Sequence, residues 1–261
     1  MSIRSLGLRS DLLSMAGICQ TETHPNGIIM RTPLEPDYWC GNVLIKTDQS
    51  VDPATDIAFF QARFPQSDHI KILWDIPCPD VAAVRAAFPP HFEIEAFDVL
   101  TKHGAATARS CPTGINIREI GTHSEWAASE HLAAEIAGQE GFDHDRHAPY
   151  LARRYQARKA QVSTGLGGWF GAYDGDTLVA HMGLFHDQEV IRFQAVETKS
   201  SHRRRGICAA LLSQVSAWAH RRAPDAIQVI VAQADSDAGR LYRRQGFDQT
   251  ERLVEATYRG Y

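Results

Sequence analysis

The segment from Val190 to Phe247 constrains the fold more than any other part of the chain. A β-branched run is followed by Arg203-Arg204-Arg205-Gly206-Ile207-Cys208, and apolar residues then recur at helical spacing. The N-terminus of a helix presents unpaired N–H groups and a partial positive charge, so this pattern predicts an anion site at Gly206. Glycine permits a positive φ and a close approach of a ligand to the backbone. The arginines alone also fit a solvated basic run at the start of an ordinary helix.

The order of elements around this segment favours the first interpretation. We expect strands at 169–173, 177–185 and 190–198, which together form a meander joined by short turns. After the helix that begins at Gly206 we expect a strand at 226–231, a helix at 237–245 closed by Gly246, and a last strand at 253–258. Asp235 and Asp237 are candidate N-caps of the second helix.

From about Gly114 to the end, these motifs resemble those of the GNAT (Gcn5-related N-acetyltransferase) family. Arg203, Gly206 and Cys208 stand at the positions of the family's Gln/Arg-x-x-Gly-x-Gly/Ala phosphate loop, although cysteine departs from the third. The family's later Asn-x-x-Ala-x-x-Leu-Tyr-x-x-x-Gly-Phe pattern is matched at Ala238, Leu241, Tyr242, Gly246 and Phe247, with Asp235 in place of the asparagine. The resemblance implies an α/β (α+β) fold in which helices flank a mixed, mostly antiparallel sheet. It also implies acetyl-CoA (coenzyme A) as co-substrate, and no metal.

The resemblance assigns roles to individual residues. The segment Val196-Glu197-Thr198 resembles the family's splayed strand, whose main chain pairs with the pantetheine arm. Tyr242 is expected to be catalytic, because a phenol with a pKa near ~10 stays protonated at neutral pH and can donate to the departing thiolate. The expected cofactor-binding residues are Ala195, Val196, Thr198, Arg203, Arg204, Arg205, Gly206, Ile207, Cys208, Ala209, Asp235, Ala238, Leu241 and Tyr242.

The residue that takes the proton from the amine stays open. The candidates are Glu197, Glu189, His186 and the cluster Glu140, Asp143, His144 and His147, and a water chain to bulk is the alternative. The cluster is expected to be a flexible polar loop between two helices that shapes the acceptor pocket, since its spacing matches no dedicated metal pattern. Cys208 has arginines and a helix N-terminus beside it, which would lower its pKa. Packing is still the favoured role for this cysteine, because the family's chemistry needs no covalent step.

The elements between 113 and 168 fit the same picture. We expect a strand at 115–120, a helix capped by Ser124 that runs through Glu135, and a second helix that Pro149 opens and that stops by Gly165. The glycine-rich run 165–168 leads into a strand, so it is a tight turn or hinge and not a nucleotide fingerprint.

The length of the chain predicts two domains, 1–112 and 113–261. The first half has a helix at 5–15, then strands at 27–32 and 39–47, a helix at 55–64, a strand at 70–75, a helix at 79–88 and a strand at 93–101. The later part repeats the strand-helix order of the second half, which indicates a duplication. Its loop 50–56 has two acids and neither glycine nor arginine, so this half is predicted to be a degenerate GNAT-like domain without a cofactor loop. We expect it to pack on the active half, with Phe59, Phe60, Phe64, Trp39 and Trp74 as its core.

Composition narrows the class of protein. The formal net charge is −4 and no apolar run approaches the roughly 18 residues of a membrane span. Five scattered cysteines favour reduced thiols, and the N-terminus lacks a secretory pattern, so we expect a cytoplasmic protein that binds neither membranes nor nucleic acid. The oligomeric state is open.

The leading hypothesis is therefore an N-acetyltransferase that transfers acetyl directly from acetyl-CoA to an amine of a small molecule or peptide. The alternatives are a non-catalytic acyl-CoA sensor or interaction module and a transferase that uses a longer acyl-CoA. The acceptor amine is not determined by the sequence, although acidic residues at 140–145 hint at a cationic one.

Overall fold

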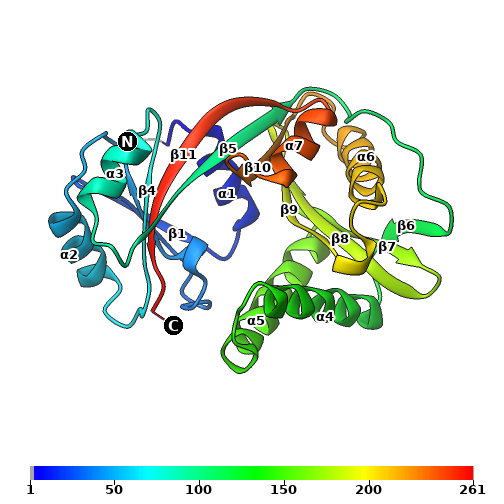
Figure 1. The fold of residues 1–261 in the computed structure, drawn as a ribbon, viewed down its shortest axis with the longest axis horizontal. Coiled ribbons are helices and arrows are strands. Elements are labelled where there is room, and N and C mark those ends of the chain that lie inside the picture. The colour runs from blue at the N-terminus through cyan, green and yellow to red at the C-terminus, as the bar shows by residue number, and fades with distance from the viewer. Residues whose placement is uncertain (1–2, 261) are drawn as a thin grey trace. The chain divides into compact units, whose positions relative to one another are not determined.

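The structure, a computed structural model, describes residues 3–260 and shows a mixed α/β protein with a mostly antiparallel sheet (Figure 1). The chain forms two compact units. Unit 1 comprises Met1–Leu100, Val231–Arg240 and Gln249–Tyr261, and unit 2 comprises Thr101–Ile230 and Leu241–Asp248. Each unit is described by itself.

Unit 1 is built on strands in the order β1-β2-β3-β4-β11-β5. Its elements are α1 (Leu6–Ser14), β1 (Gln20–His24), β2 (Gly27–Arg31), the 3₁₀ turn η1 (Trp39–Gly41), β3 (Val43–Lys46), α2 (Pro53–Arg63), β4 (Ile70–Trp74), α3 (Val81–Ala87), β5 (Glu93–Lys102) and β11 (Asp248–Tyr258). Helices α2 and α3 cover one face of this sheet, where Phe60, Ile72 and Trp74 are fully buried. Phe59 and Phe64 pack against this core from partly buried positions, whereas Trp39 lies outside it, half-buried beside His69.

Unit 2 contains the elements on which the resemblance rests. They are β6 (Ile115–Glu119), α4 (His123–Gln139), α5 (His144–Ser163), β7 (Gly167–Asp174), β8 (Thr177–His186), β9 (Val190–Thr198), the 3₁₀ turn η2 (Ser200–His202), α6 (Ile207–His220) and, shared with unit 1, β10 (Ile227–Gln233) and α7 (Asp237–Arg244). The strands β6 to β9 form an antiparallel meander, and β10 is parallel to β9. The α4 and α5 helices lie side by side (Figure 1).

Most elements expected from the sequence are present, and the corrections have local causes. The strand β1 was missed because Gln-Thr-Glu-Thr-His carries no apolar signal and lies exposed as a hairpin partner of β2. The cap of α4 is Thr122 and not Ser124, because Thr122 and Glu125 form a reciprocal capping box. The α5 helix begins at His144, so Pro149 lies inside it and does not open it.

The two compact units do not test the predicted domain division at 112/113, which stays a prediction. The units show, however, that the last strand belongs to unit 1, since Val254 to Tyr258 pair antiparallel with β4.

Candidate functional site

The strand β9 separates from its neighbour on one side only. Its parallel pairing with β10 covers Val190, Ile191 and Arg192 and then ends, whereas β8 follows β9 as far as Thr198. The first four residues of β9 are buried and the remaining five are half-buried. The main-chain groups beyond Arg192 on the β10 side are therefore free of a strand partner, as the sequence expectation of a splayed strand requires.

A β-bulge changes the direction of side chains within this splayed part. The register between β8 and β9 shifts between His181 and Gly183, and Ala195 has a φ of 47°. A positive φ is uncommon outside glycine, so the surrounding pairing must hold this residue in place. The bulge brings Glu197 directly opposite His181.

The turn after β9 ends at Gly206, which is the N-cap of α6 with φ 81° and ψ 0°. A Cβ at this position would have only Pro112 Cγ within 4 Å, at 3.9 Å, so the backbone conformation is what requires glycine here. The first backbone hydrogen bond of α6 runs from Ala210 N–H to the Gly206 carbonyl. The N–H groups of Ile207, Cys208 and Ala209 therefore precede the hydrogen-bonded turns of the helix and are suited to hold an anion.

The three arginines before Gly206 are exposed but differ in their contacts. Arg203 Nε donates to the Thr198 carbonyl at 3.1 Å, which ties the loop to the end of β9. Arg205 lies 3.7 Å from a carboxylate oxygen of Asp174, which offsets part of its charge. Arg204 adopts φ 65°, so two left-handed residues, Arg204 and Gly206, shape the turn.

Tyr242 lies on α7 and is 5% exposed. Burial raises the pKa of the Tyr242 phenol, the Cys208 thiol adds to this effect, and the buried Arg192 guanidinium on β9 opposes it. The phenol therefore keeps its proton well above neutral pH. Leu241 precedes it and is half-buried.

Cys208 corrects one expectation from the sequence. Burial raises the pKa of the Cys208 thiol to about 11, although the sequence predicted that the helix N-terminus and the neighbouring arginines would lower it. Desolvation of the thiolate outweighs these charges, because the arginine side chains are exposed to water. Cys208 is thus a neutral packing residue at neutral pH.

Glu197 is engaged by a residue that the sequence analysis did not single out. His181 Nε2 lies 2.8 Å from Glu197 Oε2, and His181 Nδ1 lies 2.9 Å from Ser129 Oγ on α4. Burial by itself would raise the pKa of Glu197, but the His181 ring and the charges of Arg158 and His147 outweigh it and hold that pKa below its usual value. His181 was missed because a single histidine in an apolar strand gives no signal until the strand register is known.

The other candidate bases lie elsewhere in unit 2. Glu189 is exposed in the turn before β9, and His186 packs against Trp218, both at the opposite end of β9 from Glu197. Burial lowers the pKa of His186, and the Arg222 charge lowers it further. Glu140 and Asp143 are exposed. Of the candidates, His147 on α5 is near enough to Glu197 to lower its pKa, whereas Glu189 and His186 are not gathered with it.

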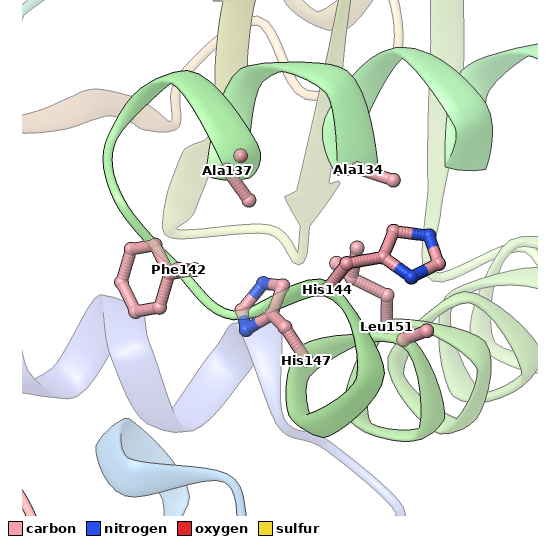
Figure 2. A pocket seen from close by; sticks show the side chains of 8 residues that line it. Ala134, Ala137, Phe142, His144, His147 and Leu151 are labelled. Carbon is pink, nitrogen blue, oxygen red and sulfur yellow. The ribbon is translucent and has the colours of Figure 1, made fainter. Parts of the chain in front are cut away.

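The segment around His144 and His147 is not the long polar loop that was expected. Only residues 140–143 connect α4 to α5, and both histidines lie in the first turns of α5. They line a small, open pocket whose walls are otherwise apolar, with Ala134, Ala137, Phe142 and Leu151 among them (Figure 2). The Phe142 and His147 rings are 4.7 Å apart, and burial lowers the pKa of His147. Among the described residues, no three metal-ligand side chains are gathered anywhere.

Two expected cofactor residues, Asp235 and Ala238, fall in unit 1, and both are exposed. Asp235 has φ 61°, and its carbonyl accepts from Arg240 Nη1 at 2.6 Å. Unit 2 contains all the other expected cofactor residues, on β9, the loop, the first turn of α6 and α7.

The N-terminus of α2 in unit 1 is capped by a carboxylate of the chain itself. The Asp52 side chain accepts from Thr55 N–H as the N-cap of α2. Asp56, fully buried, pairs with Lys46 Nζ at 2.6 Å. These carboxylates would repel an anion at the N-terminus of α2. The prediction that this half lacks a cofactor loop stays a prediction.

Comparisons with known proteins identify the fold. Residues 129–247 match the acetyltransferase (GNAT) family model. No curated protein sequence matches the chain. The GCN5-related N-acetyltransferase from Kribbella flavida has the same fold, with 18% identity, a TM-score of 0.68 and coverage of 99% of this chain and 97% of that one.

Two further solved structures resemble the whole chain. A conserved protein of unknown function from Staphylococcus epidermidis ATCC 12228 aligns with 13% identity and a TM-score of 0.69 over 94% of this chain and 96% of that one. A tandem GNAT protein from the clavulanic acid biosynthesis pathway aligns with 12% identity and a TM-score of 0.57 over 97% of this chain and 88% of that one. The expected resemblance, including the tandem arrangement, is thereby confirmed at the level of fold. Residues 129–247 are a domain of the GNAT acetyltransferase family, and the chain that carries them has a GNAT fold along nearly its whole length.

Proposed function

We propose that the protein is an acetyl-CoA-dependent N-acetyltransferase that transfers acetyl directly to an amine of a small molecule or peptide. The observation that carries this proposal is the one-sided separation of β9 beside a helix whose N-cap is Gly206 in the left-handed conformation. These two features offer unpaired main-chain groups to an extended arm and unpaired N–H groups to a diphosphate.

The cofactor would be held mainly by main-chain atoms. The N–H groups of Ile207, Cys208 and Ala209 suit the diphosphate, and the arginines at 203–205 add positive charge around it. The splayed part of β9, including Ala195, Val196 and Thr198, suits an amide-bearing arm that adds to the sheet edge. Bound acetyl-CoA supplies the thioester; no metal is part of the proposal.

Tyr242 acts as the hydrogen-bond donor to the departing sulfur. The amine nitrogen forms a bond to the thioester carbonyl carbon, the carbon–sulfur bond breaks, and the electron pair remains on sulfur. Because the pKa of Tyr242 is raised, complete proton transfer to a thiolate is uphill. The phenol therefore stabilises the developing negative charge by a hydrogen bond and keeps its own proton.

Glu197 accepts the proton that the amine loses. Its carboxylate is ionised at neutral pH because its pKa lies below the usual value, and its side chain is 29% exposed on the splayed strand. It therefore combines access and negative charge with a position on the splayed part of β9, where Glu189, Glu140 and Asp143 do not lie.

A screen of amines for thiol release from acetyl-CoA tests the proposal. We expect at least one amine to be acetylated, and we expect Tyr242→Phe to lower kcat by about 10²-fold while the affinity for acetyl-CoA is retained. Binding of acetyl-CoA with no turnover across a broad panel would instead favour a sensor. Competition between acetyl-CoA and longer acyl-CoAs shows which acyl group the protein prefers to bind.

The proposed location is the cytoplasm, because all five cysteines are free thiols, as is usual in a reducing compartment. As a separate finding, no helix within residues 3–260 has the length and apolar character needed to span a membrane.

A further inference from the structure

A chain of buried polar side chains connects Glu197 to the interior of unit 2. Trp169 Nε1 on β7 donates to Ser129 Oγ at 3.1 Å, Ser129 Oγ lies 2.9 Å from His181 Nδ1, and His181 Nε2 lies 2.8 Å from Glu197 Oε2. Ser129, Trp169 and His181 each have 0% exposure. Four elements, α4, β7, β8 and β9, thus contribute one member each.

The acceptor at the outer end fixes the direction of this chain. An ionised carboxylate can only accept, so His181 Nε2 carries a hydrogen and donates it to Glu197 Oε2. In the neutral ring Nδ1 is then an acceptor and receives the hydrogen of Ser129 Oγ, which itself accepts from Trp169 Nε1. Among the described residues, the side-chain hydrogen bond to the Glu197 carboxylate is made at Oε2, so the second oxygen, Oε1, can accept a hydrogen bond from a ligand.

The packing around the chain leaves little freedom to the ring of His181. Gly183 lies two residues along β8, and a Cβ there would come within 1.9 Å of the Trp169 ring, so the indole fills the space of the missing side chain. The Tyr155 hydroxyl donates to the Ser129 carbonyl at 2.9 Å and holds this part of α4 against α5. A buried, fully paired network of this kind specifies one arrangement.

We propose that His181 is a positioning residue: it holds Oε2 of Glu197, leaves Oε1 for the proton of the acceptor amine, and is itself kept in the Nε2–H tautomer by the Glu197 carboxylate at Nε2 and the Ser129 hydroxyl at Nδ1. This inference rests on the proposed function, which makes Glu197 the proton acceptor.

The groups that lower the pKa of Glu197 come from two elements besides its own strand. They are the hydrogen-bonding ring of His181 on β8 and, on α5, Arg158 and His147. Loss of His181 removes the first of the influences that lower the pKa of Glu197, and burial, which raises it, is then opposed only by the two α5 residues. A carboxylate acts as a base above its pKa, so a raised pKa moves the acidic limb of the activity profile to higher pH.

Magnetic resonance on the full chain tests the positioning without any turnover. The histidines carry nitrogen-15 and the glutamate carboxyl groups carry carbon-13, and the Glu197→Gln variant assigns the carboxyl signal of Glu197. We expect His181 in the Nε2–H tautomer and the pKa of Glu197 below its usual range. The pKa of Glu197 should rise in His181→Phe and rise less in His181→Gln, whose amide can still donate. Ser129→Ala should weaken the tautomer preference. An Nδ1–H tautomer in the wild type, or a Glu197 that titrates identically in His181→Phe, overturns the inference.

Kinetics supply the second readout. We expect kcat to fall on the order of 10- to 100-fold in His181→Phe, with partial recovery in His181→Gln and an unchanged KM for acetyl-CoA, because a positioned general base contributes roughly 10²–10⁴. Circular dichroism melts identify variants that fail to fold. If His181→Phe fails to fold, Ser129→Ala is the smaller substitution to measure instead.

If no amine is acetylated but the tautomer and titration are as expected, the proposed function fails and the network stands. If an amine is acetylated and His181→Phe keeps the full rate, the inference fails and the proposed function stands. If Glu197→Gln keeps the full rate, the inference and the role of Glu197 fail, and the acetyltransferase activity stands.

Discussion

Cys208 shows how burial decides the chemistry of a single side chain. It stands at a helix N-terminus beside three arginines, yet its pKa is raised to about 11. The sequence places the cysteine next to these charges but does not show that the thiol is desolvated and the guanidinium groups are not. His181 was missed for a similar reason, because its position opposite Glu197 depends on the register of β8 and β9. The motif around Tyr242 is local, so the sequence could nominate that residue.

We predict that Cys208→Ala retains acetyl-CoA affinity and kcat within about 3-fold. A thiol with a raised pKa is almost wholly protonated at pH 7, so it neither attacks the thioester nor reacts rapidly with alkylating reagents. Isothermal titration and steady-state kinetics check the first part, and iodoacetamide labelling followed by peptide mass spectrometry checks the second. An acetylated Cys208 trapped during turnover would contradict this assignment.

At the scale of elements, the pattern of side chains predicted β9 to the residue and the start of α6, because alternation and a glycine before an apolar periodic run are local signals. It did not predict β1, whose five polar residues form a strand only through the hairpin with β2. Nor did it predict that α5 starts before Pro149, because a proline is a stronger local signal for a helix start than for a helix interior.

Gly206 gives a prediction for the loop that begins α6. Gly206→Val should destabilise the protein by about 1–2 kcal/mol, because the left-handed conformation is costly for a side chain with Cβ. It should also weaken acetyl-CoA binding by at least about 10-fold, because the new side chain projects where the backbone must be open to the ligand. Gly121→Ala is the matched control, since that glycine has open space and no positive φ. Equal affinity in the two variants would refute the location of the diphosphate.

The capping box of α4 gives a prediction with a defined pH dependence. The N–H groups of Thr122 and Gly121 donate to Glu125 and lower its pKa to about 2. Because the pKa of Glu125 is lower in the folded protein than in the unfolded chain, its ionised carboxylate stabilises the fold at pH values above the unfolded pKa near 4.5. This stabilisation is lost as the pH falls toward 2. Glu125→Gln should therefore cost about 1 kcal/mol at pH 7, and the difference from wild type should shrink below pH 4.5. Urea titrations at several pH values measure it; a difference independent of pH would count against this cap.

At the scale of the whole molecule, the last strand of the chain belongs to the unit that the first hundred residues form. The last strand, β11, pairs with β4 in unit 1 and supplies Glu255, which lies 2.7 Å from the buried Lys71 Nζ. Burial alone would lower the pKa of Lys71, and the charges of Cys40 and Glu255 raise it instead. The sequence predicts β11 as a strand but contains no local signal of its partner, because pairing between distant segments depends on topology.

Ending the chain at Phe247 should therefore destabilise unit 1 even though that unit is formed mainly by the first hundred residues. The truncation exposes the edge of β4 and leaves Lys71 buried without its carboxylate, a change that typically costs 3–5 kcal/mol. Hydrogen exchange should show lost protection at Ile70 to Trp74. A chain ending at Tyr258 is the control, because it keeps all of β11 and removes only residues 259–261, with the exposed Arg259 to Glu93 pair and the Arg259 contact to the Trp39 ring. Unchanged protection in the shorter chain would contradict this view of unit 1.

The central claim is that the N-terminus of α6 holds the diphosphate of a coenzyme whose sulfur lies beside Tyr242. A crystal structure of the protein grown with acetyl-CoA tests it most directly. We expect diphosphate oxygens within hydrogen-bond distance of the N–H groups of Ile207, Cys208 and Ala209, the pantetheine arm along the splayed part of β9, and the sulfur within reach of the Tyr242 hydroxyl. Acetyl-CoA bound elsewhere, or a loop that stays closed by its own side chains at saturating ligand, would contradict the account.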